Sequence, residues 1–240
     1  MKRKLKAIAA VLLVLVMLGS AMPIQLAAEA MTPLTTRYAT PDGYNDHDYQ
    51  KMVAFFEQTD ENGVRNGEKL SENYDPTDPG TWREADGSEI GVEWTVDDDE
   101  YRICEIRIGS SSLGMMGNLD VSGCTGLDRL DCSENQLTEL DLSWNTSLRW
   151  LDCSGNRITE LDLTANSELE ALRCSENQLT AIDVSANTSL TELNCSGNQL
   201  TELDLSENTS VYRLECEDNY ITFLDLTNNR IDIDTVSAEG

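Results

Sequence analysis

Apolar side chains recur in a fixed order over the second half of the chain. Written in rows of 21 from Leu127, the sequence gives LDRLDCSENQLTELDLSWNTS, LRWLDCSGNRITELDLTANSE, LEALRCSENQLTAIDVSANTS, LTELNCSGNQLTELDLSENTS and VYRLECEDNYITFLDLTNNRI. The rows share the pattern LxxLxCxxNxLTxLDLSxNxx. Residues around 130–132 alternate between apolar and polar, which predicts one short strand in each row. The Leu-Asp-Leu triplet at 140–142 predicts a second, shorter extended segment.

A single row is too short to enclose its own apolar side chains. The rows must therefore stack, so that each coil covers the interior of the next and the strands form a parallel sheet. A period of about 20 to 29 residues with this order of Leu, Cys and Asn is typical of leucine-rich repeats. The sequence thus predicts a mainly β or α/β solenoid over residues 127–231, followed by a C-terminal tail at residues 232–240.

Cysteine and asparagine form ladders along the rows and are predicted to be scaffold. Coils about 4.8 Å apart suit the Cα separation of a disulfide, but parallel side chains do not meet, so free buried thiols are expected. The amide of an Asn where the strand turns away can satisfy backbone groups of the turn. The ladder residues are Cys132, Cys153, Cys174, Cys195, Cys216, Asn135, Asn156, Asn177, Asn198 and Asn219. A second Asn column, expected at the opposite corner, is Asn145, Asn166, Asn187, Asn208 and Asn229.

These rows resemble the leucine-rich repeats of internalin-type surface proteins from Gram-positive bacteria, in the 21-residue version that contains a cysteine. The resemblance covers residues 127–231 at nearly every consensus position, with Val211 and a few other Ile or Val replacements. It implies a right-handed, curved solenoid with a concave sheet, a stacked cysteine ladder and a role in adhesion. It implies no particular ligand, because ligand contacts lie at the variable positions.

Residues 31–126 precede the regular rows and are predicted to form an N-terminal α+β cap with an irregular first coil. Some cap is required, because the first coil would otherwise expose its apolar end. Ile106, Ile108 and Leu113 are expected in the irregular coil, before Leu119.

Within the cap, residues 46–58 have the apolar spacing of an amphipathic helix, and Asn62-Gly63 marks its end. Residues 71–90 are rich in Pro, Gly, Asp and Asn and predict a loop. Residues 91–94 and 101–108 predict two strands, separated by an acidic turn. A helix, a Trp and two such strands are similar to the caps that precede many extracellular repeat arrays.

The first thirty residues have the pattern of a signal peptide. A basic start is followed by an apolar run from 7 to 18, which is too short to cross a hydrocarbon core of about 30 Å, and then by small residues. Cleavage is expected after Ala30, with Ala21 as an earlier option and an uncleaved anchor as the alternative. No cysteine follows the run to carry a lipid. The chain is therefore predicted to be extracellular or on the cell surface.

The charge is strongly negative, at −27 for the whole chain. Removing residues 1–30 leaves 13 basic and 43 acidic residues, a net charge of −30. Such a surface repels nucleic acid and anionic lipid headgroups, and it favours basic proteins or cations as partners.

Catalytic chemistry has little support in the sequence. The one histidine, His47, stands between two Asp residues at the start of the predicted cap helix, and no nucleophile motif accompanies it. No enzyme activity, cofactor or metal site is predicted, since zinc sites use short CxxC-type pairs that are lacking here. Cys104 and Cys124 lie outside the ladder, and a disulfide between them is an alternative to two free thiols.

An Asp recurs at one position of every row, as Asp141, Asp162, Asp183, Asp204 and Asp225. Like charges about 5 Å apart repel by about 0.8 kcal/mol per pair in water. Hydroxyls such as those of Thr138, Thr159 and Thr180 are expected to hydrogen-bond to these carboxylates. A calcium-binding edge is the alternative, although the ligand spacing of an EF-hand loop is missing.

The variable strand positions remain as the candidate ligand site, and Trp150 is their odd member. An exposed Trp flanked by Arg129, Asp152 and Arg173 has the composition of an interface hot spot. The predicted ligand-binding residues on the concave face are Arg129, Asp131, Trp150, Asp152, Arg173, Glu192, Asn194, Arg213 and Glu215. We expect a non-catalytic, secreted or surface-displayed module that binds a protein or, as second choice, a glycan. An architectural envelope component or spacer without a specific ligand is the alternative.

Overall fold

The computed structural model describes residues 38–82, 90–97, 99–109, 114–115 and 117–231. The predicted signal peptide, the C-terminal tail and Leu113 lie outside these residues. Within the described residues, none of the helices has the length and apolar composition needed to span a membrane.

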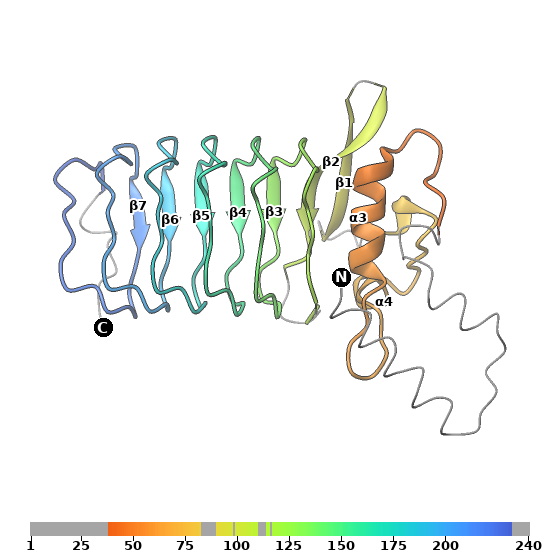
Figure 1. The fold of residues 1–240 in the computed structure, drawn as a ribbon, viewed down its shortest axis with the longest axis horizontal. Helices are drawn as coiled ribbons and strands as arrows, with labels where there is room; N and C mark the ends of the chain where they lie inside the picture. Colours follow the sequence, from red (N-terminus) through yellow and green to blue (C-terminus); the bar gives the residue numbers. More distant parts are fainter. Residues whose placement is uncertain (1–37, 83–89, 98, 110–113, 116, 232–240) are drawn as a thin grey trace, which may run out of the picture. The chain divides into compact units, whose positions relative to one another are not determined.

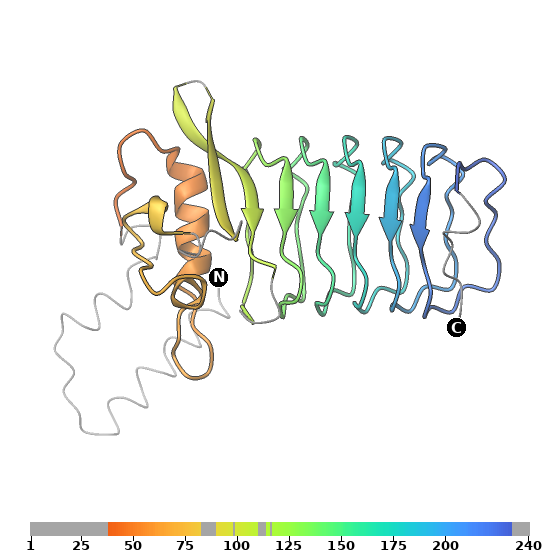
Figure 2. The same cartoon turned by 180° about the vertical axis from the view of Figure 1, so that it is seen from behind.

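Among the described residues, the strands form one sheet of seven. They follow one another across the sheet in sequence order, as Figures 1 and 2 show. It begins with an antiparallel pair, β1 (Gly91–Asp97) and β2 (Glu100–Arg107). Every later pairing is parallel, starting with β2 against β3. The short strands are β3 (Arg129–Asp131), β4 (Trp150–Asp152), β5 (Ala171–Arg173), β6 (Glu192–Asn194) and β7 (Arg213–Glu215). This arrangement confirms the predicted solenoid with a parallel sheet and an α+β cap.

The short strands follow from the alternation in the rows. The middle residue of each is a Leu that points inward and is at most 1% exposed, as Leu130 and Leu193 illustrate. The register matches each residue with the one 21 positions later, so Leu130 pairs with Leu151. The Leu-Asp-Leu triplets form no second set of paired strands among the described residues. Each coil therefore has one face of paired strands, and hydrogen bonds outside the strands join neighbouring coils at other points, as from the Arg157 N–H to the Leu137 carbonyl at 2.8 Å.

The cap is built around helix α3 (Asp46–Phe56), which packs Tyr49, Met52 and Phe56 into the core. The Asn45 side chain accepts a hydrogen bond from the Asp48 N–H at 3.2 Å and so caps the helix. The helix ends two residues earlier than predicted.

Two further helical turns, α4 (Asn66–Leu70) and η2 (Pro79–Thr81), were not predicted. Both are too short to show an apolar period in the sequence.

Strand β2 belongs to the cap and to the solenoid at once. It forms a hairpin with β1, and its Ile106 pairs with Leu130 of β3 as the first rung of the parallel sheet. Asp48, which is fully buried, accepts hydrogen bonds from Arg102 Nε at 2.8 Å and from the Ile103 N–H at 3.0 Å. This carboxylate therefore ties the cap helix to the strand on which the coils are stacked.

Candidate functional site

The outer face of the sheet carries two columns of variable residues, and all nine predicted ligand-binding positions lie in them. The pairing places Arg129 beside Trp150 and Asp152 beside Arg173, and it continues in the same way to β7. Glu105 of β2 extends the first column by one residue, next to Arg129. Sequence reasoning missed Glu105 because only Ile106 and Ile108 of this segment were expected in the irregular first coil, and the variable columns were taken to begin at Arg129.

Trp150 is half-buried, not exposed as predicted. The Arg129 guanidinium carbon lies 3.7 Å from the centroid of its ring, and that of Arg173 lies 5.6 Å away. Both distances are within the range of cation–π attraction. Arg129 Nε is in turn 2.9 Å from Glu105 Oε1. Two arginines from the neighbouring coils therefore contact the aromatic ring, and we call Arg129, Trp150 and Arg173 the Trp150 stack.

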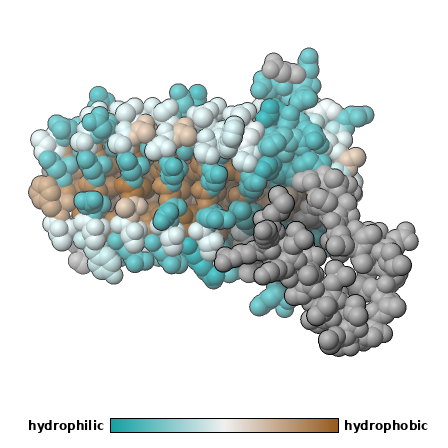
Figure 3. All heavy atoms as spheres, in the orientation of Figure 1, coloured by the Kyte–Doolittle hydropathy of each residue, from teal (hydrophilic) through white to brown (hydrophobic). Residues whose placement is uncertain are grey.

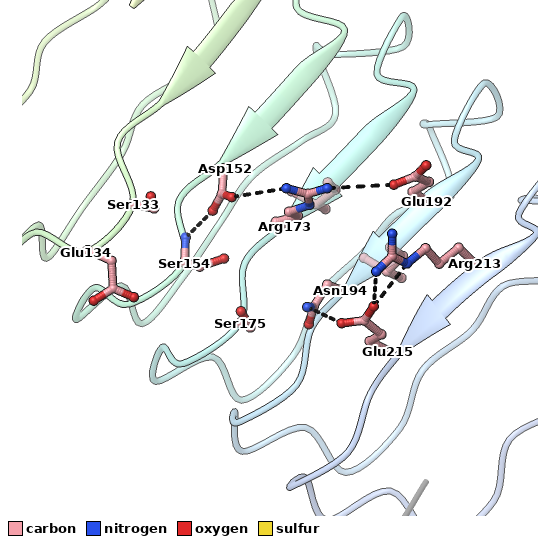
Figure 4. Close-up of a pocket in the computed structure, with 12 residues that line it drawn as sticks. Ser133, Glu134, Asp152, Ser154, Arg173, Ser175, Glu192, Asn194, Arg213 and Glu215 are labelled. Carbon is pink, nitrogen blue, oxygen red and sulfur yellow. Dashed lines mark hydrogen bonds and ion pairs between the residues drawn. The ribbon is translucent and has the colours of Figure 1, made fainter. Parts of the chain in front are cut away.

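Beside this stack, the face is hollowed to a volume of about 400 Å³. Figure 4 shows Arg173 reaching between two carboxylates, at 3.9 Å from Asp152 and 4.0 Å from Glu192. Both distances are too long for direct hydrogen bonds. The side chains that line the hollow are Ser133, Glu134, Asp152, Ser154, Leu172, Arg173, Ser175, Glu192, Leu193, Asn194, Arg213 and Glu215. Arg129, Asp131 and Trp150 lie outside the lining.

The second arginine of the hollow is paired more tightly. Arg213 approaches Glu215 Oε1 at 2.7 Å, and Asn194 donates to Glu215 Oε2 at 2.7 Å. Arg213 is therefore neutralised within the chain, whereas Arg173 keeps hydrogen-bond donors for a ligand.

Asp152 has an unusual environment for a carboxylate. Burial, and after it the nearby charge of Asp131, raises its pKa, although a 3.0 Å hydrogen bond from the Ser154 N–H acts in the opposite direction. A cation placed beside Asp152 would stabilise its charged form. The hollow is thus suited to ion-pair and hydrogen-bond recognition.

Glu134 was not singled out in the sequence, yet it lines the hollow with a φ of 55°, in the left-handed region. Glu176 and Asp218 share this conformation, and Gly155 and Gly197 occupy the same row position between them. The alternation of S-E-N and S-G-N in the rows was the available signal. Glycine adopts this conformation without steric cost, whereas Glu does not.

A family model described as Leucine Rich Repeat matches residues 147–167 and 189–210, largely the second and fourth coils. The matched segments have the 21-residue register that the paired strands show. The second and fourth coils therefore match leucine-rich repeats, and the other three coils share their sequence pattern. Such solenoids generally act as protein-interaction modules.

Two solved structures from Listeria monocytogenes are similar to the chain. The functional domain of InlJ, which includes a cysteine ladder, is 40% identical, with a TM-score of 0.51, over 57% of this chain and 32% of that chain. The internalin InlF is 22% identical, with a TM-score of 0.45, over 56% of this chain and 39% of that chain. This chain thus spans 32% of the InlJ domain. No curated protein matches it.

The likeness to InlJ confirms the resemblance to internalin-type repeats with a cysteine ladder. Neither the family model nor the InlJ domain indicates a catalytic family.

The ladder cysteines of the leucine-rich repeats are buried free thiols. Burial raises the pKa of Cys195 to about 12, so this sulfur stays protonated and unreactive at neutral pH. Cys104 and Cys124 are also free, and the alternative of a disulfide between them is not realised in this structure.

Both Asn columns bond across neighbouring repeats. Asn156 donates from Nδ2 to the Cys132 and Cys153 carbonyls, at 3.0 Å each, and accepts from the Leu137 N–H at 2.9 Å. At the other corner, Asn166 donates to the carbonyls of Leu142 at 3.2 Å and Asn145 at 2.9 Å. Each amide therefore joins a repeat to the one before it.

The recurring Asp residues are bonded differently from the prediction. Asp162 accepts from the N–H and the hydroxyl of Thr164, at 3.0 and 2.7 Å, and the corresponding Asp of each repeat bonds to the residue two positions later. The expected partners Thr138, Thr159 and Thr180 were wrong, because an Asp side chain readily closes a local turn onto the residue two positions on. These hydrogen bonds lower the pKa of Asp162.

His47, the one histidine, makes a contact between the cap and the first coil. Its Nε2 lies 2.6 Å from the carbonyl oxygen of Ser122. The contact accounts for its position without a catalytic role.

Proposed function

We propose that this chain is an exported, non-catalytic binding module that engages a protein through the outer face of its sheet, in a role like adhesion. Cleavage of residues 1–30 and display outside the cell are part of the proposal, and they rest on the signal-peptide pattern. The internalin-like repeats are consistent with a surface or secreted location.

The observation that supports this function best is the stack of Arg129, Trp150 and Arg173 beside the hollow. Arg and Trp are the side chains most enriched among residues that dominate binding energy at protein interfaces. The stack holds Trp150 in one orientation before a partner arrives, which lowers the entropy cost of binding. A protein is preferred to a glycan, because Arg129 covers a face of the ring on which a sugar would stack.

The charges of the hollow indicate a basic partner. Glu134, Asp152, Glu192 and Glu215 outnumber Arg173 and Arg213 among its lining residues. The large negative charge of the whole chain would steer a cationic protein toward it.

The test is retention of surface or host proteins on the immobilised chain, compared among three forms. The double variant W150A/R173A removes the stack, and W144A/R157A is the matched control. Trp144 is 60% exposed and, like Arg157, lies outside the strands. We expect the first variant to lose specific proteins that the wild type and the control both retain. Equal retention by all three forms would favour an architectural role.

A further inference from the structure

The coils have a second continuous surface, formed by the first residue of each Leu-Asp-Leu triplet or of its Ile-Asp-Val equivalent. We name it the triplet strip, and it consists of Leu140, Leu161, Ile182, Leu203 and Leu224. Leu161 is 8% exposed and Leu140 and Leu203 are 6% exposed, whereas the inward leucines of the strands are at most 1% exposed. Ile182 and Leu224 are half-buried. Figure 3 shows hydrophobic surface along the coils between rows of hydrophilic side chains.

Acidic side chains border the triplet strip on both sides. Exposed Glu139, Glu160 and Glu202 precede it in their coils. Exposed Asp141, Asp162, Asp183, Asp204 and Asp225 follow it. No Lys or Arg occupies either position in any of the five rows. Near the cap a hollow of about 510 Å³ opens beside the strip, and its lining includes Leu140 with four of these carboxylates.

The Glu border is interrupted by an apolar residue in the third and fifth coils. Ala181 and Phe223 stand at the row position that is Glu in the other coils. Beside the short Ala181 side chain, Ile182 is half-buried, whereas Leu140, Leu161 and Leu203 are buried. Phe223 is 78% exposed, which is unusual for a large aromatic side chain on a soluble protein. The surface thus offers apolar contacts and negative charge together.

We propose that the triplet strip is a docking surface for a cationic, amphipathic segment of a protein partner. The apolar side chains of that segment would lie along the strip, and its Lys and Arg side chains would pair with the bordering carboxylates. Relief of repulsion between closely spaced Asp residues would add to the attraction. The triplet strip shares no residue with the sheet face. Docking on the strip and binding at the sheet face are therefore tested independently.

Charge complementarity selects this occupant. A second copy of the chain would bring acidic borders against acidic borders. A free metal ion would make no use of Phe223 or Ile182. A segment that carries both cationic and apolar side chains uses every part of the surface.

The test measures binding of two labelled synthetic peptides of equal length to the full chain by fluorescence anisotropy. One alternates Lys and Leu, and the other is all Lys. The variant D162N/D183N/D204N removes three border charges while the Asn oxygen can still accept the turn hydrogen bonds. The control E168Q/E170Q/E207Q removes three exposed charges elsewhere on the coils. Unchanged thermal unfolding of both variants confirms that they are folded.

We expect the D162N/D183N/D204N variant to bind the Lys-Leu peptide about tenfold more weakly, because it loses three surface ion pairs with the peptide. The control variant should bind it less than about twofold more weakly. F223S should weaken the Lys-Leu peptide by about tenfold through lost apolar burial and leave polylysine unchanged.

Three results would each overturn the proposal. An equal loss of peptide affinity in the Asp variant and its control would show that the peptide is attracted by net charge alone. Unchanged affinity of the F223S variant for the Lys-Leu peptide would show that Phe223 makes no apolar contact with it. Self-association of the chain that F223S abolishes would identify a second copy as the occupant.

Discussion

In the coils the hydrogen bonds of the Asn ladder recur every 21 residues, whereas the bonds of Asp48 in the cap occur once. The bond from the Leu137 N–H to Asn156 reappears between Ile158 and Asn177, and so on to Asn219. Asp48 has no such equivalent, although it holds helix α3 to β2. Loss of one bond in a stack of similar coils is a local event, because each repeat contacts only its neighbours. Loss of the Asp48 bonds would separate helix α3 from strand β2, and the cap would then cover the apolar end of the coils less well.

The contrast is tested most strongly at Asp48. Replacing it with Ala leaves the Arg102 guanidinium and the Ile103 N–H without their acceptor, in a site where Asp48 itself is fully buried. We expect D48A to lower the free energy of unfolding by about 3 kcal/mol, the usual cost of breaking a buried ion pair. Urea unfolding followed by circular dichroism measures this loss.

D48N is the matched control, because it keeps an acceptor oxygen while removing the charge. It should lose less stability than D48A. A loss below about 1 kcal/mol in D48A would place Asp48 among ordinary surface ion pairs and would remove the distinction between cap and coils.

The coils are tested by comparing two members of one ladder. Asn156 is 7% exposed, and its removal leaves the buried Leu137 N–H unpaired, so N156A should cost about 2 kcal/mol. Asn219 makes the same bonds in the last described coil but is only half-buried. N219A should therefore lower the free energy of unfolding by about 1 kcal/mol, because water can replace some of the hydrogen bonds of Asn219. Urea unfolding of the two variants gives both values, and equal losses would contradict the idea that position in the stack matters.

The same contrast explains what could be predicted from the sequence. The coil register followed from the period alone, because one spacing determines which residues lie side by side. The order of residues in the columns around Trp150 was therefore predicted correctly. The position of the Arg129 guanidinium over the Trp150 ring was not predicted, because it depends on the conformation of a long side chain. In the cap no period exists, so α4 and the role of Asp48 had no sequence signal. The hydroxyl partners of the Asp column were wrong because local turn bonding prevailed over pairing along the row.

The smallest effect concerns the alternation of Glu and Gly after each strand. Glu176 is held at a φ of 53°, and its Oε1 lies 2.7 Å from where a Cβ on Gly197 would stand. Replacing Glu176 with Gly relieves the backbone strain, which raises the free energy of unfolding. Glycine is also more flexible in the unfolded chain, and this lowers the free energy of unfolding by a smaller amount. We expect E176G to raise the free energy of unfolding by about 1 kcal/mol, seen as a higher melting temperature. E168G is the control at an exposed position without a positive φ, and it should melt lower than the wild type. If E176G also melted lower, the Glu176 side chain would stabilise its coil by more than its backbone strain costs, and the alternation would serve packing against Gly197.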